Sequence, residues 1–155
     1  MKATCALTEG SVDFVVIGGI AVMAHGYVRA TADTDITVDP DRQNLERLAA
    51  VLANLEAVLP GADPIAGDPA GARSLSFRGN PRFETSLGRL YIVQSPAGAP
   101  NYSDLAARAV TVELDDLKLR ICAYEDLVAM KEATARDQDR LDLTALREAR
   151  SEPPE

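Results

Sequence analysis

The sequence predicts an α/β fold, in which a β-sheet is covered by helices, within a single domain of residues 1–150. Short β-branched runs alternate with stretches of helical periodicity, and the chain closes with two such helical stretches. Its 155 residues suffice for one hydrophobic core and are too few for two ordinary domains. Residues 151–155 (SEPPE) are predicted to form a disordered tail.

The N-terminal part of the chain predicts a strand–helix–strand unit. Asp13–Gly18 is a buried strand in this prediction, because a β-branched run there ends in glycine. Ile20–His25 is apolar and rich in alanine, which favours a short helix that stops at Gly26. Thr34–Val38 alternates apolar and polar residues, as a second strand would.

A longer helix and a Gly/Pro-rich loop follow this unit. Pro40-Asp41 begins the helix, and Pro60-Gly61 ends it. Five apolar residues at helical spacing predict the face that packs on the core: Leu45, Leu48, Ala49, Leu52 and Leu55. Residues 61–72 predict a loop, either mobile or acting as a lid.

The remainder of the chain predicts further strands and helices without an internal repeat. Three short strand-like pieces lie within residues 73–94, namely SLSFR (74–78), RFETS (82–86) and RLYIVQ (89–94). The other predicted elements are a loop at 95–101, a helix at Tyr102–Arg108, a hairpin of Val110–Leu114 and Leu117–Cys122 around Asp115-Asp116, and helices at Tyr124–Ala135 and Asp137–Ala149.

Composition excludes several classes of protein. The chain is 46% apolar, and no window approaches the 18 consecutive apolar residues of a membrane span. The first residues lack the apolar core of a secretory signal, so we expect a cytoplasmic protein. Cys5 and Cys122 are the two cysteines, and without a CxxC pair they predict reduced thiols rather than a zinc site.

The overall charge argues against a broad nucleic-acid-coating role. The formal net charge is −8 at pH 7, whereas proteins that coat DNA or RNA gain affinity from basic surfaces. Any polyanionic ligand therefore requires a local cluster of cations or a bound metal ion.

The stretch from Val15 to Val38 contains the clearest chemical signal. Asp33 and Asp35 are two positions apart on a predicted strand, so their side chains project from the same face. A divalent metal would offset their repulsion, since Mg²⁺ takes oxygen ligands and completes its shell with water and substrate phosphates. Gly18-Gly19 precedes a helix and would let the backbone approach phosphate oxygens closely. These features together predict a site for a nucleoside triphosphate.

This stretch resembles the signature of the DNA polymerase β-like nucleotidyltransferase superfamily. The matching residues are Ile17-Gly18-Gly19 and then Asp33-Thr34-Asp35-Ile36. The string GGIAVMAHGYVRATADTD, with a His-Gly and an Arg-x-Thr (Arg29 to Thr31) before the aspartates, is similar to a small bacterial branch that contains AbiEii-type toxins.

A second block, ICAYEDLVAMKEATARDQDRLDLTAL, resembles the C-terminal helices of the same branch. The likeness covers about Asp13–Leu55 and Val112–Arg147, and it implies a mixed β-sheet flanked by helices, with C-terminal helices. The implied nucleotide-binding residues are Gly18, Gly19, Arg29, Thr31, Lys131 and Asp139. The implied metal ligands are Asp33 and Asp35, which with Lys131 and Glu84 are the candidate catalytic residues.

The chain departs from the family pattern at one position. The family usually supplies a third carboxylate from a central strand, and the matching run, Gly88 to Val93, has Tyr91 where an aspartate is expected. Such a carboxylate bridges metal or takes the proton from the attacking hydroxyl. Glu84, one strand earlier, would substitute if the hairpin turned its side chain inward.

Simpler structural roles exist for several of these residues. Asp33 and Asp35 could end a strand in solvent, and Gly18-Gly19 could form a turn without binding phosphate. Arg29 either holds a phosphate or pairs with an aspartate, and Lys131 either binds the nucleotide or forms a surface ion pair. Three further residues have structural alternatives: His25 could end its helix, and Asp139 and Asp142 could start or pack a helix.

The leading hypothesis is a metal-dependent enzyme that uses Mg²⁺ or Mn²⁺ to transfer a nucleoside monophosphate from an NTP to an acceptor hydroxyl. The acceptor is a tRNA, a protein or a small molecule, and a toxin with a cognate antitoxin is one form of this hypothesis. One alternative is a nucleotide-binding or partner-binding module that has lost catalysis, which Tyr91 motivates. Another is an antitoxin-like or structural subunit of a two-gene pair.

Overall fold

The computed structural model describes residues 2–76, 79–114 and 117–151. Its elements, in chain order, are α1 (Lys2–Glu9), β1 (Phe14–Val16), α2 (Gly18–Ala24), β2 (Asp33–Val38), α3 (Arg42–Asn54), α4 (Pro69–Ser76), β3 (Arg82–Thr85), β4 (Gly88–Ile92), α5 (Tyr102–Arg108), β5 (Val110–Leu114), β6 (Leu117–Ile121), α6 (Tyr124–Thr134) and α7 (Asp137–Ser151). This order confirms the α/β class that the sequence predicts.

The described strands form one mixed sheet in the order β3-β4-β2-β1-β6-β5. The central strands β1 and β2 are antiparallel, whereas β1 with β6 and β2 with β4 are parallel. Two antiparallel pairs, β3 with β4 and β5 with β6, complete the edges. Because β1 and β2 lie in the middle of the sheet, the strand–helix–strand unit of the sequence forms its centre.

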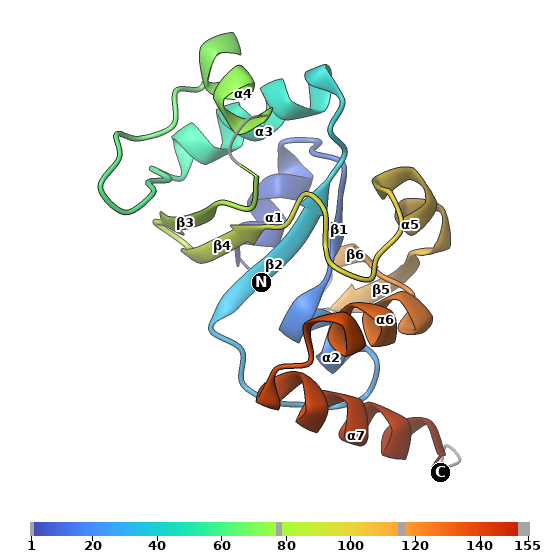
Figure 1. Ribbon diagram of the computed structural model, residues 1–155. Helices are drawn as coiled ribbons and strands as arrows, with labels where there is room; N and C mark the ends of the chain where they lie inside the picture. The colour runs from blue at the N-terminus through green and yellow to red at the C-terminus, as the bar shows by residue number, and fades with distance from the viewer. Residues whose placement is uncertain (1, 77–78, 115–116, 152–155) are drawn as a thin grey trace.

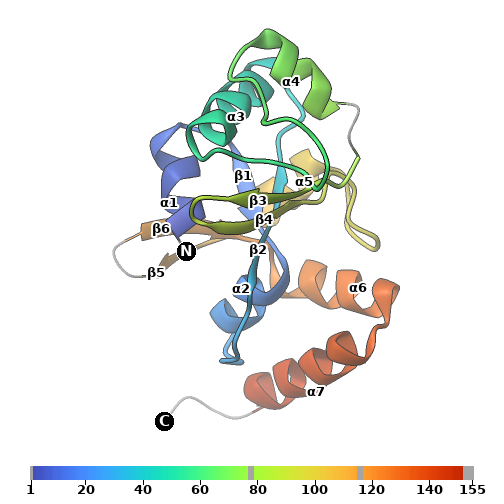
Figure 2. The ribbon, with the colours of Figure 1, turned by 90° about the vertical axis from the view of Figure 1, so that its left-hand side faces the viewer.

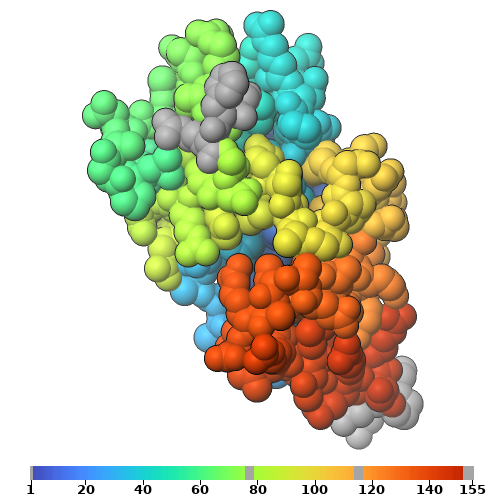
Figure 3. Space-filling model, viewed as in Figure 1, coloured from blue at the N-terminus to red at the C-terminus, as the bar shows by residue number. Residues whose placement is uncertain are grey.

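Helices occupy opposite ends of the molecule. In Figures 1 and 2, α3 and α4 lie at one end, α6 and α7 lie at the other, and the sheet lies between them. In the space-filling view, the orange atoms of the C-terminal helices face the green and yellow atoms of the β3–β4 region, and blue atoms of the N-terminal part are visible between them (Figure 3). Part of the N-terminal half of the chain is thus visible between the C-terminal helices and the β3–β4 region.

The core confirms the helix that was predicted from the spacing of its leucines. The side chain of Asp41 accepts hydrogen bonds from the backbone of Gln43 and Asn44 at 2.9 and 3.3 Å and so caps α3. All five apolar residues predicted for the inner face of the helix are buried: Leu45, Leu48, Ala49, Leu52 and Leu55. This face packs on the central strands, where Val15 and Val16 are fully buried.

One predicted strand is wrong. Residues 74–76 of the expected strand SLSFR belong to α4, which also takes in the end of the predicted loop 61–72. The side chain of Asp68 accepts hydrogen bonds from the backbone of Ala70 and Gly71, each at 2.9 Å. Pro69 follows as the first helical residue, so the Asp-Pro pair is a helix-start signal that outweighs the strand propensity of the sequence after it.

Two further predictions need correction at the chain ends. The sequence analysis assigned no helix before residue 13, whereas α1 forms there and buries Ala3 and Leu7, one helical turn apart. Ser151, expected in the tail, ends α7. Residues 152–155 of the tail, the predicted turn Asp115-Asp116 and residues 77–78 lie outside the described part of the chain. Within that part, none of the helices has the length and apolarity that a membrane crossing requires.

Candidate active site

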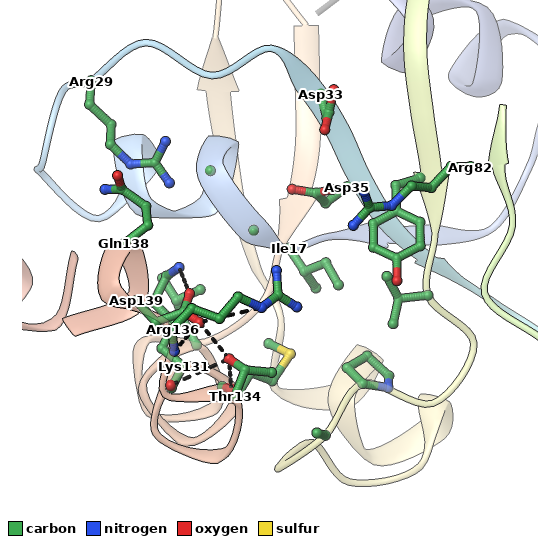
Figure 4. Close-up of a pocket in the computed structure, with 18 residues that line it drawn as sticks. Ile17, Arg29, Asp33, Asp35, Arg82, Lys131, Thr134, Arg136, Gln138 and Asp139 are labelled. Carbon is green, nitrogen blue, oxygen red and sulfur yellow. Dashed lines mark hydrogen bonds and ion pairs between the residues drawn. The ribbon is translucent and has the colours of Figure 1, made fainter. Parts of the chain in front are cut away.

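The central strands, the β3–β4 pair and the C-terminal helices enclose one cavity of about 250 Å³. It lies where the chain passes from β1 into α2, and residues of β2, β3, β4, α6 and α7 line the rest of it (Figure 4). Its charged lining consists of four cations and three carboxylates: Arg29, Arg82, Lys131, Arg136, Asp33, Asp35 and Asp139. The protein is acidic overall, but this cavity supplies the local cations that a polyanionic ligand requires.

The glycine pair Gly18-Gly19 lines this cavity at a place where no larger residue fits. Gly18 has a φ of +61°, and a Cβ atom at this position would collide with the carboxylate of Asp35. A Cβ atom at Gly19 would lie 2.5 Å from Oγ1 of Thr31. The pair therefore allows α2 to begin directly against β2, where the backbone N–H of Gly19 donates a hydrogen bond to the carboxylate of Asp35.

Pairing across β3, β4 and β2 arranges the polar side chains in two rungs on one face of the sheet. The first rung is Glu84, Arg89 and Asp33, and the second rung is Arg82, Tyr91 and Asp35. In each rung the β4 residue lies between a β3 residue and an aspartate of β2. Tyr91 is thus the direct neighbour of Asp35, where the sequence comparison places the missing carboxylate.

The two aspartates have unequal surroundings. Oδ1 of Asp33 lies 2.7 Å from Nε of Arg89, an ion-pair distance, yet it is buried and has no hydrogen-bond partner of proper geometry. Burial is the main cause that raises the pKa of Asp35, and the nearby charge of Asp33 adds to it, against a hydrogen bond from the Gly19 backbone. Both carboxylates therefore keep oxygen atoms that a cation could take.

The opposite wall of the cavity contains a buried charge cluster formed by Arg29, Lys131, Asp139 and Asp142. Nζ of Lys131 lies 3.0 Å from Oδ1 of Asp139 and 2.7 Å from Oδ2 of Asp142. Arg29 donates two hydrogen bonds to Asp142, from Nε at 2.8 Å and from Nη2 at 2.9 Å. The cluster joins α6, α7 and the segment before β2, which are far apart in the sequence.

The acids of this cluster are stabilised as carboxylates. Burial alone would raise the pKa of Asp142, but hydrogen bonds from Arg29, Lys131 and Gln138 outweigh it and hold the pKa below its ordinary value. The pKa of Asp139 is lowered in the same way against burial, chiefly by hydrogen bonds from Thr134 and Lys131. Each cation of the cluster thus has a firmly ionised partner.

The other candidate residues lie around the cavity or away from it. Thr31 lies behind the glycine pair and donates a hydrogen bond from Oγ1 to the backbone carbonyl of Asp33 at 3.2 Å. Glu84 is exposed, and Arg89 separates it from Asp33 within the first rung. His25 contacts the backbone carbonyl of Cys122 at 2.8 Å and packs edge-on against Tyr124, which joins α2 to the start of α6.

Three further residues reach the cavity and were not identified from the sequence. The Arg82 guanidinium stacks 4.3 Å from the centre of the Tyr91 ring, and Figure 4 shows it directed toward Asp35. Arg136 extends into the cavity from the turn between α6 and α7, and Gln138 donates to Asp142 at 2.9 Å. No sequence pattern identifies Arg82, because its place depends on the pairing of β3 with β4.

The donor set fits one divalent cation. Asp33 and Asp35 present carboxylate oxygens from one face of β2, and Oδ1 of Asp33 is a buried oxygen without a hydrogen bond. Within residues 2–76, 79–114 and 117–151, no cluster of three Asp, Glu, His or Cys residues is arranged to hold a metal. Mg²⁺ commonly takes one or two protein carboxylates and completes its shell with water and substrate phosphates, so two are enough.

Comparison with known proteins gives a family match. The model of a family described as "Nucleotidyltransferase of unknown function (DUF6036)" matches residues 3–147. No curated protein matches the chain by sequence. The family match spans the glycine pair, both rungs and the buried charge cluster.

Several solved structures share the fold. An antigenic nucleotidyltransferase-like protein from Paracoccidioides brasiliensis is 15% identical, with a TM-score of 0.61 over 93% of this chain and 72% of that one. The lincosamide antibiotic adenylyltransferase LnuA, solved with lincomycin, is 14% identical, with a TM-score of 0.55 over 91% and 89%. ANT(2")-Ia, in complex with adenylyl-2"-tobramycin, is 13% identical, with a TM-score of 0.50 over 95% and 94%. At these identities the likeness establishes a nucleotidyltransferase fold.

Proposed function

The chain belongs to the family of nucleotidyltransferases whose model matches residues 3–147, and we propose that it transfers a nucleoside monophosphate from an NTP to an acceptor hydroxyl. The observation that carries this proposal is the convergence of three features on one cavity: the glycine pair, the two aspartates of β2 and the cationic wall. Nucleotidyl transfer requires a seat for the phosphates, a carboxylate pair for a metal and cations that offset the charge of the triphosphate.

Each residue has a definite task in this reaction. Gly18 and Gly19 seat the β- and γ-phosphates against the start of α2, since their lack of side chains lets α2 begin close to Asp35 and Thr31 at the cavity. Lys131 and Arg29 face the phosphates, and the carboxylates of Asp139 and Asp142 hold these two cationic side chains in place. Asp33 and Asp35 would hold a divalent ion, Mg²⁺ or Mn²⁺, which would supply positive charge to stabilise the negative charge of the phosphates.

The chemical step is an in-line displacement at phosphorus. The acceptor oxygen forms a bond to the α-phosphorus, the bond between the α-phosphorus and the bridging oxygen breaks, and pyrophosphate leaves with that oxygen. The hydroxyl proton passes to a base, and Glu84, the acid of the first rung on β3, is the candidate stand-in for the third carboxylate. Since Arg89 lies between Glu84 and Asp33, Glu84 reaches the acceptor only if the side chain of Arg89 turns away.

A second candidate function is nucleotide binding without catalysis. It is favoured by Tyr91, which occupies the place beside Asp35 and has no carboxylate to accept a proton. The nature of the acceptor, a toxin role with a cognate antitoxin, the AbiEii-like branch and a cytoplasmic location remain predictions from the sequence. LnuA and ANT(2")-Ia, solved with an antibiotic and an adenylylated antibiotic, motivate small molecules as acceptors to assay beside tRNA and protein.

The experiment measures binding and turnover separately. Calorimetric titration with a non-hydrolysable NTP analogue should show binding with Mg²⁺ and none with EDTA. Transfer from α-³²P-labelled NTPs to tRNA, protein and small-molecule pools should then show a labelled product. Metal-dependent binding without transfer would support the module that has lost catalysis, and absence of metal-dependent binding would contradict both functions.

Two variants then decide how the site manages without the third carboxylate. General-base assistance is typically worth about a hundred- to ten-thousand-fold in rate, so Tyr91→Asp should raise turnover by part of that range. If Glu84 already acts as the base, Glu84→Gln abolishes transfer and Tyr91→Asp adds little. Transfer that is indifferent to both changes would show that neither position supplies the base.

A further inference from the structure

The β4 side chains that share the cavity face contain no acid. Gly88–Ile92 places Arg89 beside Asp33 and Tyr91 beside Asp35. Two divalent cations, which lie about 3.5–4 Å apart in two-metal sites, need carboxylate oxygens around both ions. Here β2 supplies two carboxylates. β4 supplies the guanidinium of Arg89 and the phenol of Tyr91, and it has no third carboxylate.

The guanidinium of Arg82 lies beside Tyr91, where a third carboxylate is missing. Arg82 belongs to the second rung with Tyr91 and Asp35, and its Cζ atom lies 4.3 Å from the Tyr91 ring centre. Stacking on the ring restrains the side chain, and Figure 4 shows the guanidinium directed toward Asp35. Arg82 also lowers the pKa of Asp35 through its charge, although burial dominates and leaves that pKa raised.

A fixed positive charge at this place affects any cation that approaches. Arg82 is exposed, so solvent weakens its field, but a second divalent ion directly beside its guanidinium would still meet a like charge and be unfavourable. The same guanidinium can donate hydrogen bonds to phosphate oxygens, because its planar N–H groups match phosphate geometry. Arg82 thus supplies one function of a second metal ion, neutralising phosphate charge, without needing a third carboxylate.

We propose, on the basis of the proposed function, that this site binds one divalent cation between Asp33 and Asp35 and that Arg82 supplies the positive charge of the second. The cation enters with the triphosphate, whose oxygens complete its coordination. The nucleotide side of the site is then served by a metal ion and the acceptor side by a protein cation, so the acceptor hydroxyl is not bound to metal.

The test counts metal ions per bound nucleotide. Purified protein is dialysed against Mn²⁺ and a tritiated α,β-imido NTP analogue that cannot be cleaved, and Mn²⁺ and nucleotide in excess over the outer solution are measured. One Mn²⁺ per bound nucleotide is expected, with an electron paramagnetic resonance spectrum of an isolated ion. Two ions with a spin-coupled spectrum would overturn the inference and leave the proposed function intact. No metal-dependent nucleotide binding would overturn both.

A double variant and a matched control separate Arg82 from the rest of the surface. Tyr91→Asp alone adds the missing carboxylate while Arg82 stays, and its count should remain at one Mn²⁺, whereas Arg82→Gln combined with Tyr91→Asp should raise the count to two. Arg42→Gln also removes one positive charge, but Arg42 pairs with Glu46 on the exposed face of α3, so its count should stay at one. A count of two in the control or the wild type would contradict the role of Arg82. A count that stays at one in a folded double variant would do the same.

Discussion

Two groups of charged residues face the same cavity from opposite sides, and they differ in how completely their charges are satisfied. In the buried charge cluster, Asp142 is fully buried and accepts hydrogen bonds from Arg29 and Gln138 while it pairs with Lys131. On the rungs, Asp33 keeps a buried oxygen without a hydrogen bond, and burial raises the pKa of Asp35. Buried ion pairs with several partners thus characterise one wall. On the other wall, Asp33 has an ion pair with the half-exposed Arg89, and burial disfavours the charged form of Asp35.

This difference separates a structural role from a binding role. Buried ions that are fully paired hold elements in place, and removing one partner leaves an uncompensated charge. Carboxylates whose charges are unfavourable in the folded protein are typical of binding sites, where a bound ligand offsets their cost in free energy. In the proposed function, the buried charge cluster therefore positions the cations of the site, and the rungs would provide the place for the metal and the phosphates. The four predictions below test this division.

The largest expected effect follows from removing the acid shared by two cations. Asp142→Ala leaves Arg29 without its partner and Lys131 with Asp139 alone, so the free energy of unfolding should fall by about 3–5 kcal/mol. Urea denaturation measures the change. Arg147→Gln is the matched control, because its pair with Glu132 is exposed and should contribute about 1 kcal/mol or less. Equal losses in both variants would show that the cluster has no special structural role.

Removing the acids of the rungs should affect binding more than folding. Asp35→Asn should abolish metal-dependent NTP binding, which calorimetry measures, and should leave the apo protein as stable or more stable. The reason for the stability is that the folded state raises the pKa of Asp35, so its ionised form disfavours folding at pH 7. Asp33→Asn should also abolish binding. Retained NTP affinity in both variants would exclude a metal site at these residues.

Lowering the pH should first weaken metal binding at Asp35 and only then remove the stabilisation by Asp139 and Asp142. Asp35 has a pKa above its ordinary value of 3.8, so it takes up a proton first and metal binding weakens. Asp139 and Asp142 have pKa values below 3.8, so their stabilisation is complete above that pH and is lost only as the pH falls further. Mn²⁺-dependent NTP binding followed beside circular dichroism should show loss of binding in a still folded protein. Simultaneous loss of both would contradict the division between the walls.

The smallest expected effect concerns the cation beside Asp33. Arg89 is half-exposed, and its ion pair with Asp33 competes with a metal for the same carboxylate. Arg89→Gln should therefore strengthen binding of Mn²⁺ together with an NTP analogue by a few-fold, or less than about 1.4 kcal/mol. Calorimetry with Arg42→Gln as the control measures this change. Weaker binding would instead make Arg89 a ligand of the nucleotide.

Local patterns predicted the elements that carry the binding residues. The Gly18-Gly19 pair, the aspartates at i and i+2 and the leucine spacing of α3 all act over a few residues, and each predicted its element. The helix predicted to end at Pro60-Gly61 ends earlier, at Asn54, because Glu56 already has a positive φ of 52°. The prediction failed in two places, one where two local signals competed and one where the local signal was weak. In α4 the Asp68-Pro69 helix start outweighed a strand-like sequence, and in α1 two buried residues one turn apart were too weak a pattern to recognise.

The pairing of distant charges depended on the tertiary structure. The sequence left Arg29 and Lys131 between a ligand and an ion pair, and the fold gives both of them to Asp142, more than ten residues beyond Lys131 and over a hundred beyond Arg29. Likewise, the neighbours of Tyr91 are set by the register of β3, β4 and β2, which places Arg82 on one side and Asp35 on the other. The sequence by itself identified the glycine pair and the two aspartates as candidates, because glycine conformation and strand alternation are local. The fold decided which charges are satisfied and which stay available, because that depends on strand register and helix packing between residues far apart in the chain.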